Sequence, residues 1–175
     1  MVGVVLPAKE EPRWLQDQAV FVKAGWTPLF SQGDSAKEKA NVEALISQGI
    51  KVLIICPQDA TAAAAAAAAA KAAGVKVISY DRLIRDTDAV DYYVTFDSMA
   101  VGAAWSEYLI KQAGDTKGNP LYIYTGAATD NNAFIFFEGA WEKIQPKIAD
   151  GTFVIKNSAE AIALQGKATL TRDEE

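Results

Sequence analysis

Asp81 and Arg82 are the two adjacent residues of this chain best placed to bind a small molecule. They follow the apolar run 75–80, which predicts a buried strand, and open α/β sheets bind ligands beyond the carboxyl ends of their strands. A carboxylate accepts hydrogen bonds and a guanidinium offers a planar fork of donors, so the two together suit a polyhydroxylated molecule. The pair is equally compatible with an internal salt bridge at a strand end, and only the rest of the chain can distinguish these interpretations.

Two further groups of polar and aromatic residues lie at predicted helix starts. Arg13 and Trp14 open the first predicted helix. Asn131 and Asn132 open the helix that follows the predicted strand 121–124. Proteins recognise sugars with an aromatic face against the apolar side of the pyranose ring and with Asp, Asn and Arg at its hydroxyl groups. We therefore predict that Trp14, at an exposed helix start, stacks on a sugar ring. The alternatives are that Trp14 packs on its own domain and that one of the asparagines caps the helix.

The elements that must position these groups alternate along the chain. Short runs that are apolar throughout predict buried strands, and segments with apolar residues three and four positions apart predict helices. This alternation is typical of an α/β fold with a parallel sheet covered by helices on both faces. The predicted strands are 2–6, 26–30, 51–56, 75–80, 92–96, 121–124 and 153–155. The predicted helices are 12–24, 35–48, 60–73, 98–112 and 132–148.

Composition excludes several classes of function. Half of the 175 residues are hydrophobic, which is enough for a core, and a net charge of −5 with scattered basic residues argues against nucleic acid as a partner. The chain has no histidine, which excludes His-based nucleophile activation and His-ligated zinc. Its single cysteine, Cys56, lies in an apolar run and is expected to be an inert core residue. Neither the GxGxxG nor the GxxxxGK[ST] nucleotide motif is present, so we expect no cofactor. We also expect no metal, because strand ends and solvated turns explain the aspartates that could cluster around Mg²⁺, which are Asp59, Asp81, Asp86 and Asp97.

A polar, turn-rich segment at 113–120 interrupts the alternation and predicts a domain boundary. We therefore expect a first domain at 1–114, a hinge crossing at 115–120 and a second domain at 121–175 that is too short to be complete. Residues 62–70 are nine consecutive alanines, from which we infer only a helix. We expect no transmembrane span and no signal peptide in this sequence.

Four motifs, in this order, resemble the periplasmic sugar-binding proteins of bacterial ABC importers, in particular the xylose-binding and multiple-sugar binding branch. The motifs are Arg-Trp at 13–14, Asp-Arg-Leu-Ile-Arg-Asp at 81–86, Asp-Tyr-Tyr-Val-Thr-Phe-Asp at 91–97 and Asp-Asn-Asn-Ala at 130–133. The resemblance implies a Rossmann-like lobe, with a parallel sheet flanked by helices, plus part of a second similar lobe, and one monosaccharide bound between lobes. The ligand contacts that it implies are Arg13, Trp14, Asp81 and Arg82 from the first lobe and Asn131 or Asn132 from the second.

The function implied by the resemblance is capture of a xylose-, glucose-, galactose- or arabinose-like monosaccharide for an ABC permease, without catalysis. The implied location is the periplasm, or the outer surface of a Gram-positive cell. The alternative is the effector-binding core of a LacI-type transcription regulator, which shares the fold but needs an N-terminal helix-turn-helix, and none precedes Val2. Because most of the second lobe is not in this sequence, we expect the chain to bind sugar weakly and to self-associate around Tyr122 and Tyr124.

Overall fold

The chain forms two compact units in the computed structural model, which describes residues 1–157. The first unit consists of residues 1–96 together with 129–131, and the remaining described residues belong to the second unit. The backbone therefore leaves the first unit after residue 96, returns for a short loop, and leaves again. The final part of the expected second domain, 158–175, lies outside the described residues.

The two units divide at a different place from the boundary expected at 115–120. Helix α4 (Ser98–Ala113), which that boundary assigns to the first domain, belongs to the second unit. There it packs tightly on α5 (Asn131–Ala149), because a Cβ built on Gly102 would lie 2.0 Å from the backbone oxygen of Phe136. The polar segment after α4 is thus a turn inside the second unit.

The first unit contains a five-stranded sheet in which every neighbouring pair of strands is parallel. The strand order is β2-β1-β3-β4-β5. The strands are β1 (Val2–Leu6), β2 (Leu29–Phe30), β3 (Val52–Ile55), β4 (Lys76–Tyr80) and β5 (Tyr92–Val94). Because all five run in the same direction, the loops that follow them gather at one edge of the sheet. The α/β fold predicted from the sequence is confirmed.

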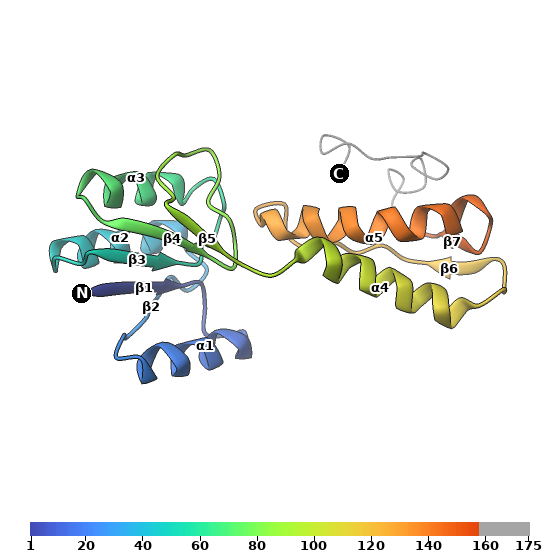
Figure 1. The fold of residues 1–175 in the computed structure, drawn as a ribbon, viewed down its shortest axis with the longest axis horizontal. Coiled ribbons are helices and arrows are strands. Elements are labelled where there is room, and N and C mark those ends of the chain that lie inside the picture. The colour runs from blue at the N-terminus through green and yellow to red at the C-terminus, as the bar shows by residue number, and fades with distance from the viewer. Residues whose placement is uncertain (158–175) are drawn as a thin grey trace. The chain divides into compact units, whose positions relative to one another are not determined.

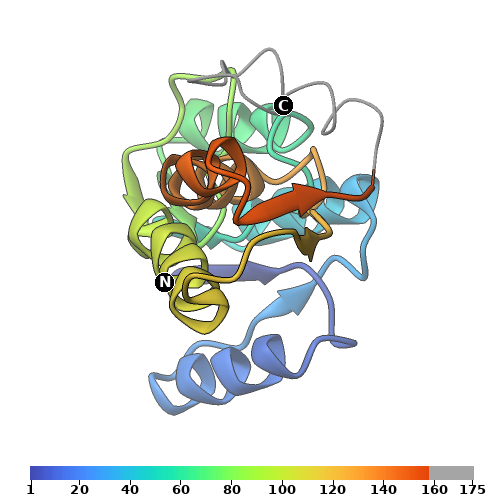
Figure 2. The same cartoon turned by 90° about the vertical axis from the view of Figure 1, so that its right-hand side faces the viewer.

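Helices cover both faces of this sheet (Figures 1 and 2). Helix α1 (Pro12–Lys23) packs on one face, and α2 (Ser35–Ser47) and α3 (Ala64–Ala72) pack on the other. The alanine run does form a helix, and its inward-facing alanines are buried against the sheet. The helix begins later than the predicted residue 60, because the side chain of Asp59 accepts the backbone N–H groups of Thr61 and Ala62 and forms a turn.

The second unit has a two-stranded parallel sheet, β6 (Asn119–Leu121) and β7 (Phe153–Ile155), which packs with α4 and α5. The strand predicted at 121–124 is therefore wrong in its bounds. Beyond the end of β7 the side chain of Asn157 replaces a partner strand, accepting from the Ile123 N–H at 2.8 Å and donating to its carbonyl at 2.7 Å. Within residues 1–157, no helix is both long enough and apolar enough to cross a membrane.

Candidate functional site

Asp81 leaves β4 in a left-handed backbone conformation, with a φ of 65°. Its N–H donates to the carbonyl of Val94 at 2.8 Å, and its own carbonyl accepts from the hydroxyl groups of Tyr93 at 3.1 Å and Thr95 at 2.7 Å. Left-handed backbone costs an L-residue about 1–2 kcal/mol, although aspartate tolerates it better than most. Strand β5 and the residue that follows it thus hold Asp81 in a conformation that it would not adopt freely.

The carboxylate of Asp81 pairs with Arg13 and not with its sequence neighbour Arg82. Nη1 of Arg13 lies 2.8 Å from Oδ1 of Asp81, and Nε lies 3.6 Å from Oδ2 of Asp17. Partial burial lowers the pKa of Arg13, but the two neighbouring carboxylates more than offset this and leave the pKa above its ordinary value. The salt-bridge alternative is therefore realised, with a different arginine from the one that the sequence suggested.

Arg82 makes its ion pair with Asp130, on the short loop that returns to the first unit. Nε of Arg82 lies 2.9 Å from Oδ2 of Asp130, and both side chains are largely buried. Nη1 of Arg82 also donates to the carbonyl of Pro57 at 3.5 Å. Backbone contact between Ala60 N–H and the Thr129 carbonyl, at 3.0 Å, holds the same loop. Arg82 therefore ties together the loops that follow β3 and β4 and the returning loop.

Trp14 is only 1% exposed, so the expectation that the helix start leaves it open to a ligand is wrong. Its ring packs in the core between α1 and the sheet, and its indole N–H has no hydrogen-bond partner among the described residues. The guanidinium carbons of Arg13 and Arg82 lie 4.6 Å and 5.7 Å from the ring centroid. The aromatic ring that remains open here is Phe96, which is 60% exposed and lies 5.2 Å from the Arg13 guanidinium.

Glu38, on α2, is a carboxylate near the site that was not predicted from the sequence, and it is only 1% exposed. Its Oε2 accepts the backbone N–H of Gln58 at 2.7 Å, in the loop after β3. Burial raises the pKa of Glu38 to about 7, while the hydrogen bond from Gln58 and the charge of Arg82 lower it and the charge of Asp59 raises it. In the sequence, Glu38 is marked only by its position four residues after Asp34, the residue that caps α2. This position does not predict burial.

Both predicted asparagines are buried at the start of α5. Asn131 directly follows Asp130 and belongs to the first unit, whereas Asn132 belongs to the second. Four of the predicted site residues are therefore brought together in the first unit, namely Arg13, Trp14, Asp81 and Arg82. Asp130 joins them as an ion-pair partner that the predicted set did not include. In residues 1–157 no three His, Cys, Asp or Glu side chains are grouped so that they could hold a metal ion.

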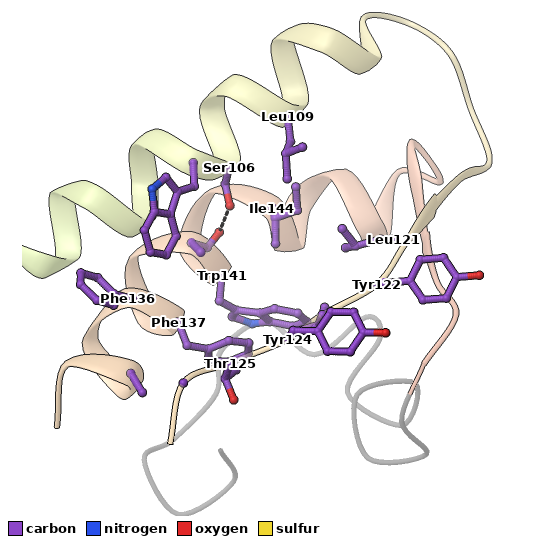
Figure 3. Close-up of a pocket in the computed structure, with 15 residues that line it drawn as sticks. Ser106, Leu109, Leu121, Tyr122, Tyr124, Thr125, Phe136, Phe137, Trp141 and Ile144 are labelled. Carbon is purple, nitrogen blue, oxygen red and sulfur yellow. Dashed lines mark hydrogen bonds between the residues drawn. The ribbon is translucent and has the colours of Figure 1, made fainter. Parts of the chain in front are cut away.

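The second unit contains an apolar pocket of about 490 Å³ between α4, α5 and the segment that follows β6 (Figure 3). Leu109, Trp141 and Ile144 line it from the helices, and a hydrogen bond of 2.8 Å from the Ser106 hydroxyl to the Ala140 carbonyl joins the two helices. None of the predicted ligand contacts lines this pocket. Its apolar lining does not offer the charged groups that bind sugar hydroxyls.

Residues 2–173 match the family model described as "Periplasmic binding protein domain". The chain is 36% identical over 170 residues to the multiple sugar-binding periplasmic receptor ChvE of Rhizobium radiobacter, covering 92% of this chain and 48% of the receptor. It is 30% identical over 156 residues to the D-xylose-binding periplasmic protein of Escherichia coli K12, covering 86% of this chain and 46% of that protein.

Among solved structures, a carbohydrate transporter solute binding protein from Chloroflexus aurantiacus, in complex with D-glucose, is 71% identical. It superimposes with a TM-score of 0.93 over 99% of this chain and 52% of its own. The chain thus spans about half the length of the relatives that it matches. A family match over almost the whole chain leads to one conclusion: this chain belongs to the periplasmic binding protein family.

Proposed function

We propose that this chain is part of a solute-binding protein that captures a monosaccharide and delivers it to an ABC permease. The observation that carries the proposal is the 71% identity to a solute-binding protein solved in complex with D-glucose, at a TM-score of 0.93. Two relatives at 30% identity or more are also named as sugar-binding or xylose-binding. D-Glucose is therefore the first ligand to test.

The charged cluster of the first unit supports this proposal chemically. Asp81 offers a largely buried carboxylate to a sugar hydroxyl that donates, and Arg13 and Arg82 offer guanidinium N–H groups to hydroxyl oxygens. Because these groups are already held in ion pairs, little side-chain freedom is lost when the sugar binds. We also propose Trp14 and either Asn131 or Asn132 as ligand contacts.

The proposed role is binding without catalysis. The location that we propose is the periplasm, or the outer surface of the cell in a Gram-positive source. A LacI-type regulator core is the weaker alternative, because the relatives at 30% identity or more named above are periplasmic binding proteins.

The first test compares D-glucose affinity in the chain and in two variants, Asp81→Ala and Arg82→Ala. Removing one member of a buried charged hydrogen bond costs about 2–5 kcal/mol of binding, so each variant should lose at least about thirtyfold in affinity. Asp88→Ala is the matched control, because Asp88 is a carboxylate paired with Lys71 at 3.0 Å whose side chain is 95% exposed. Unchanged affinity within about twofold in both site variants would contradict the assignment.

A second test concerns Trp14, which is next to both arginines of the cluster. D-Glucose should change tryptophan fluorescence, and Trp14→Phe should remove most of that change. Phe96→Leu is the comparison variant, because it alters the exposed ring beside Arg13 and leaves the tryptophans in place. A full fluorescence response in Trp14→Phe would show that Trp14 does not sense the ligand.

We further propose that the chain self-associates through the second unit. Support comes from the exposed rings of Tyr122 and Tyr124, which are 58% and 85% exposed, and from the nearby Trp105, which is 53% exposed. They border the apolar pocket beside β6, whose only strand partner in the described residues is β7. Apolar surface next to an open strand edge favours association with a second copy.

A further inference from the structure

Residues 56–60, the first part of the loop between β3 and α3, contact Arg82 and the returning loop that carries Asp130. The Pro57 carbonyl accepts from Arg82, and the Ala60 N–H donates to the returning loop. Displacing this loop would therefore move a partner of Arg82 and a support of Asp130. What holds the loop on its inner side is the carboxyl group of Glu38, through the N–H of Gln58 at 2.7 Å.

We propose that Glu38 is a positioning residue for the sugar site: its carboxyl group anchors the 56–60 loop, and the loop orients Arg82 toward the ligand. The inference rests on the proposed sugar-binding function and adds to it a residue that does not touch the ligand. A buried carboxyl group with a backbone partner in a ligand-site loop is a rigid anchor, because its own rotamer is fixed by packing.

The protonation of Glu38 gives this anchor a dependence on pH. Three groups face it: the Gln58 N–H and the Asp59 carboxylate in the anchored loop, and the Arg82 guanidinium after β4. Because burial raises its pKa to about 7, Glu38 changes from neutral to charged near neutral pH. The chain contains no histidine, so no imidazole titrates in the same pH range.

The charged form should organise the site better than the neutral form. A carboxylate accepts a backbone N–H more strongly than a neutral carboxyl group does, and its charge attracts Arg82. D-Glucose affinity should therefore rise by about two- to fivefold between about pH 6 and pH 8. By linkage, bound sugar should in turn lower the pKa of Glu38.

The test is a D-glucose titration of the 175-residue chain across this pH range, read from the indole N–H signal of Trp14 by NMR. Glu38→Gln keeps an acceptor oxygen but cannot ionise, so its affinity should match the low-pH value of the unmodified chain at every pH. Glu43→Gln is the matched control on the same helix, because Glu43 is an exposed glutamate 3.9 Å from Lys39, and it should keep the pH dependence. Glu38→Leu removes the acceptor and should weaken binding at every pH.

The outcomes separate this inference from the proposed function. Loss of the pH dependence in Glu38→Gln but not in Glu43→Gln supports the inference. A pH-independent affinity in the unmodified chain, or an unchanged dependence in Glu38→Gln, overturns the inference and leaves sugar binding standing. Absence of D-glucose binding at every pH overturns both. If Glu38→Leu does not fold, the comparison of the two glutamine variants still decides.

Discussion

Replacing Asp81 should destabilise the first unit by an amount that depends on the substituent. A charged hydrogen bond contributes about 1.5–3 kcal/mol, and we take the lower end because the Arg13 side chain is 38% exposed. The left-handed backbone adds a second term, since alanine at a φ of 65° is strained by about 1–2 kcal/mol whereas glycine is not. Asp81→Ala should therefore lower the free energy of unfolding by about 2.5–3.5 kcal/mol.

Two further variants separate the two terms. Asp81→Gly loses the ion pair but removes the backbone strain, so it should be more stable than Asp81→Ala by about 1 kcal/mol. Asp81→Asn keeps the shape and tolerates left-handed backbone, so it should lose only about 1 kcal/mol.

The assay must report on the first unit alone, because the chain has two units and need not unfold in one step. Native-state hydrogen exchange of the β3 and β4 amide groups, measured by NMR, meets this need. Asp81→Ala and Asp81→Gly with equal exchange would refute the strain argument. Asp81→Ala within about 0.5 kcal/mol of the unmodified chain would refute the ion-pair argument as well.

Three other predictions concern the rest of the chain. The pKa of Glu38 is about 7 in the folded chain and 4.5 in the unfolded chain. Between pH 4.5 and pH 7 the folded chain therefore keeps a proton that the unfolded chain has lost. The free energy of unfolding should fall by about 3 kcal/mol in total as the pH rises through this range. Glu38→Gln should remove that fall in urea titrations at several pH values, and an identical slope would contradict the burial argument. Gly102→Ala should destabilise the second unit by more than about 2 kcal/mol, because its Cβ would meet the Phe136 backbone at 2.0 Å, and unchanged exchange of α4 amides would disprove that contact. Tyr124→Lys should reduce the concentration-dependent mass seen by light scattering, whereas a monodisperse monomer before substitution would rule out self-association.

The order and type of the elements could be predicted from the sequence because most strands contain an apolar run and most helices have apolar residues three and four positions apart. Val2–Leu6 and Phe153–Ile155 have the predicted bounds. Cys56 is buried, as its apolar run indicated, and burial raises the pKa of its thiol. Strand ends were less predictable. Strand β6 ends where its partner β7 ends, and the side-chain amide of Asn157 then pairs with the backbone of Ile123. Such a tertiary contact has no local signal in the sequence.

The sequence could predict that the charged residues Arg13, Asp81 and Arg82 lie close together, but it could not predict their pairing. Arg13 lies at a helix start, and Asp81 and Arg82 follow a strand. Their closeness could be predicted because strand ends and the helix starts that follow them meet at one edge of a parallel sheet. Which arginine meets which carboxylate depends on loop geometry, and the left-handed backbone of Asp81 turns its side chain to Arg13. The burial of Trp14 was missed because a helix start is usually exposed, whereas here the ring faces the sheet.

The unit boundary was missed for a related reason. A polar turn is a local signal, but the close packing at Gly102 that joins α4 to α5 has only a single glycine as its signature in the sequence. Glu38 illustrates the same limit, because a charged residue in a helix is normally solvated and nothing local marks it as buried.

The most direct test of the sugar site is a map of NMR chemical-shift changes as D-glucose is added to the 175-residue chain. We predict a dissociation constant in the millimolar range or weaker, because about two or three hydrogen bonds of about 1.5 kcal/mol each would be supplied by the part of the family's length that this chain does not span. The shifts should centre on Arg13, Trp14, Asp81, Arg82 and the 130–132 segment. Shifts confined to the apolar pocket of the second unit, or none at saturating sugar, would contradict a sugar site in the first unit.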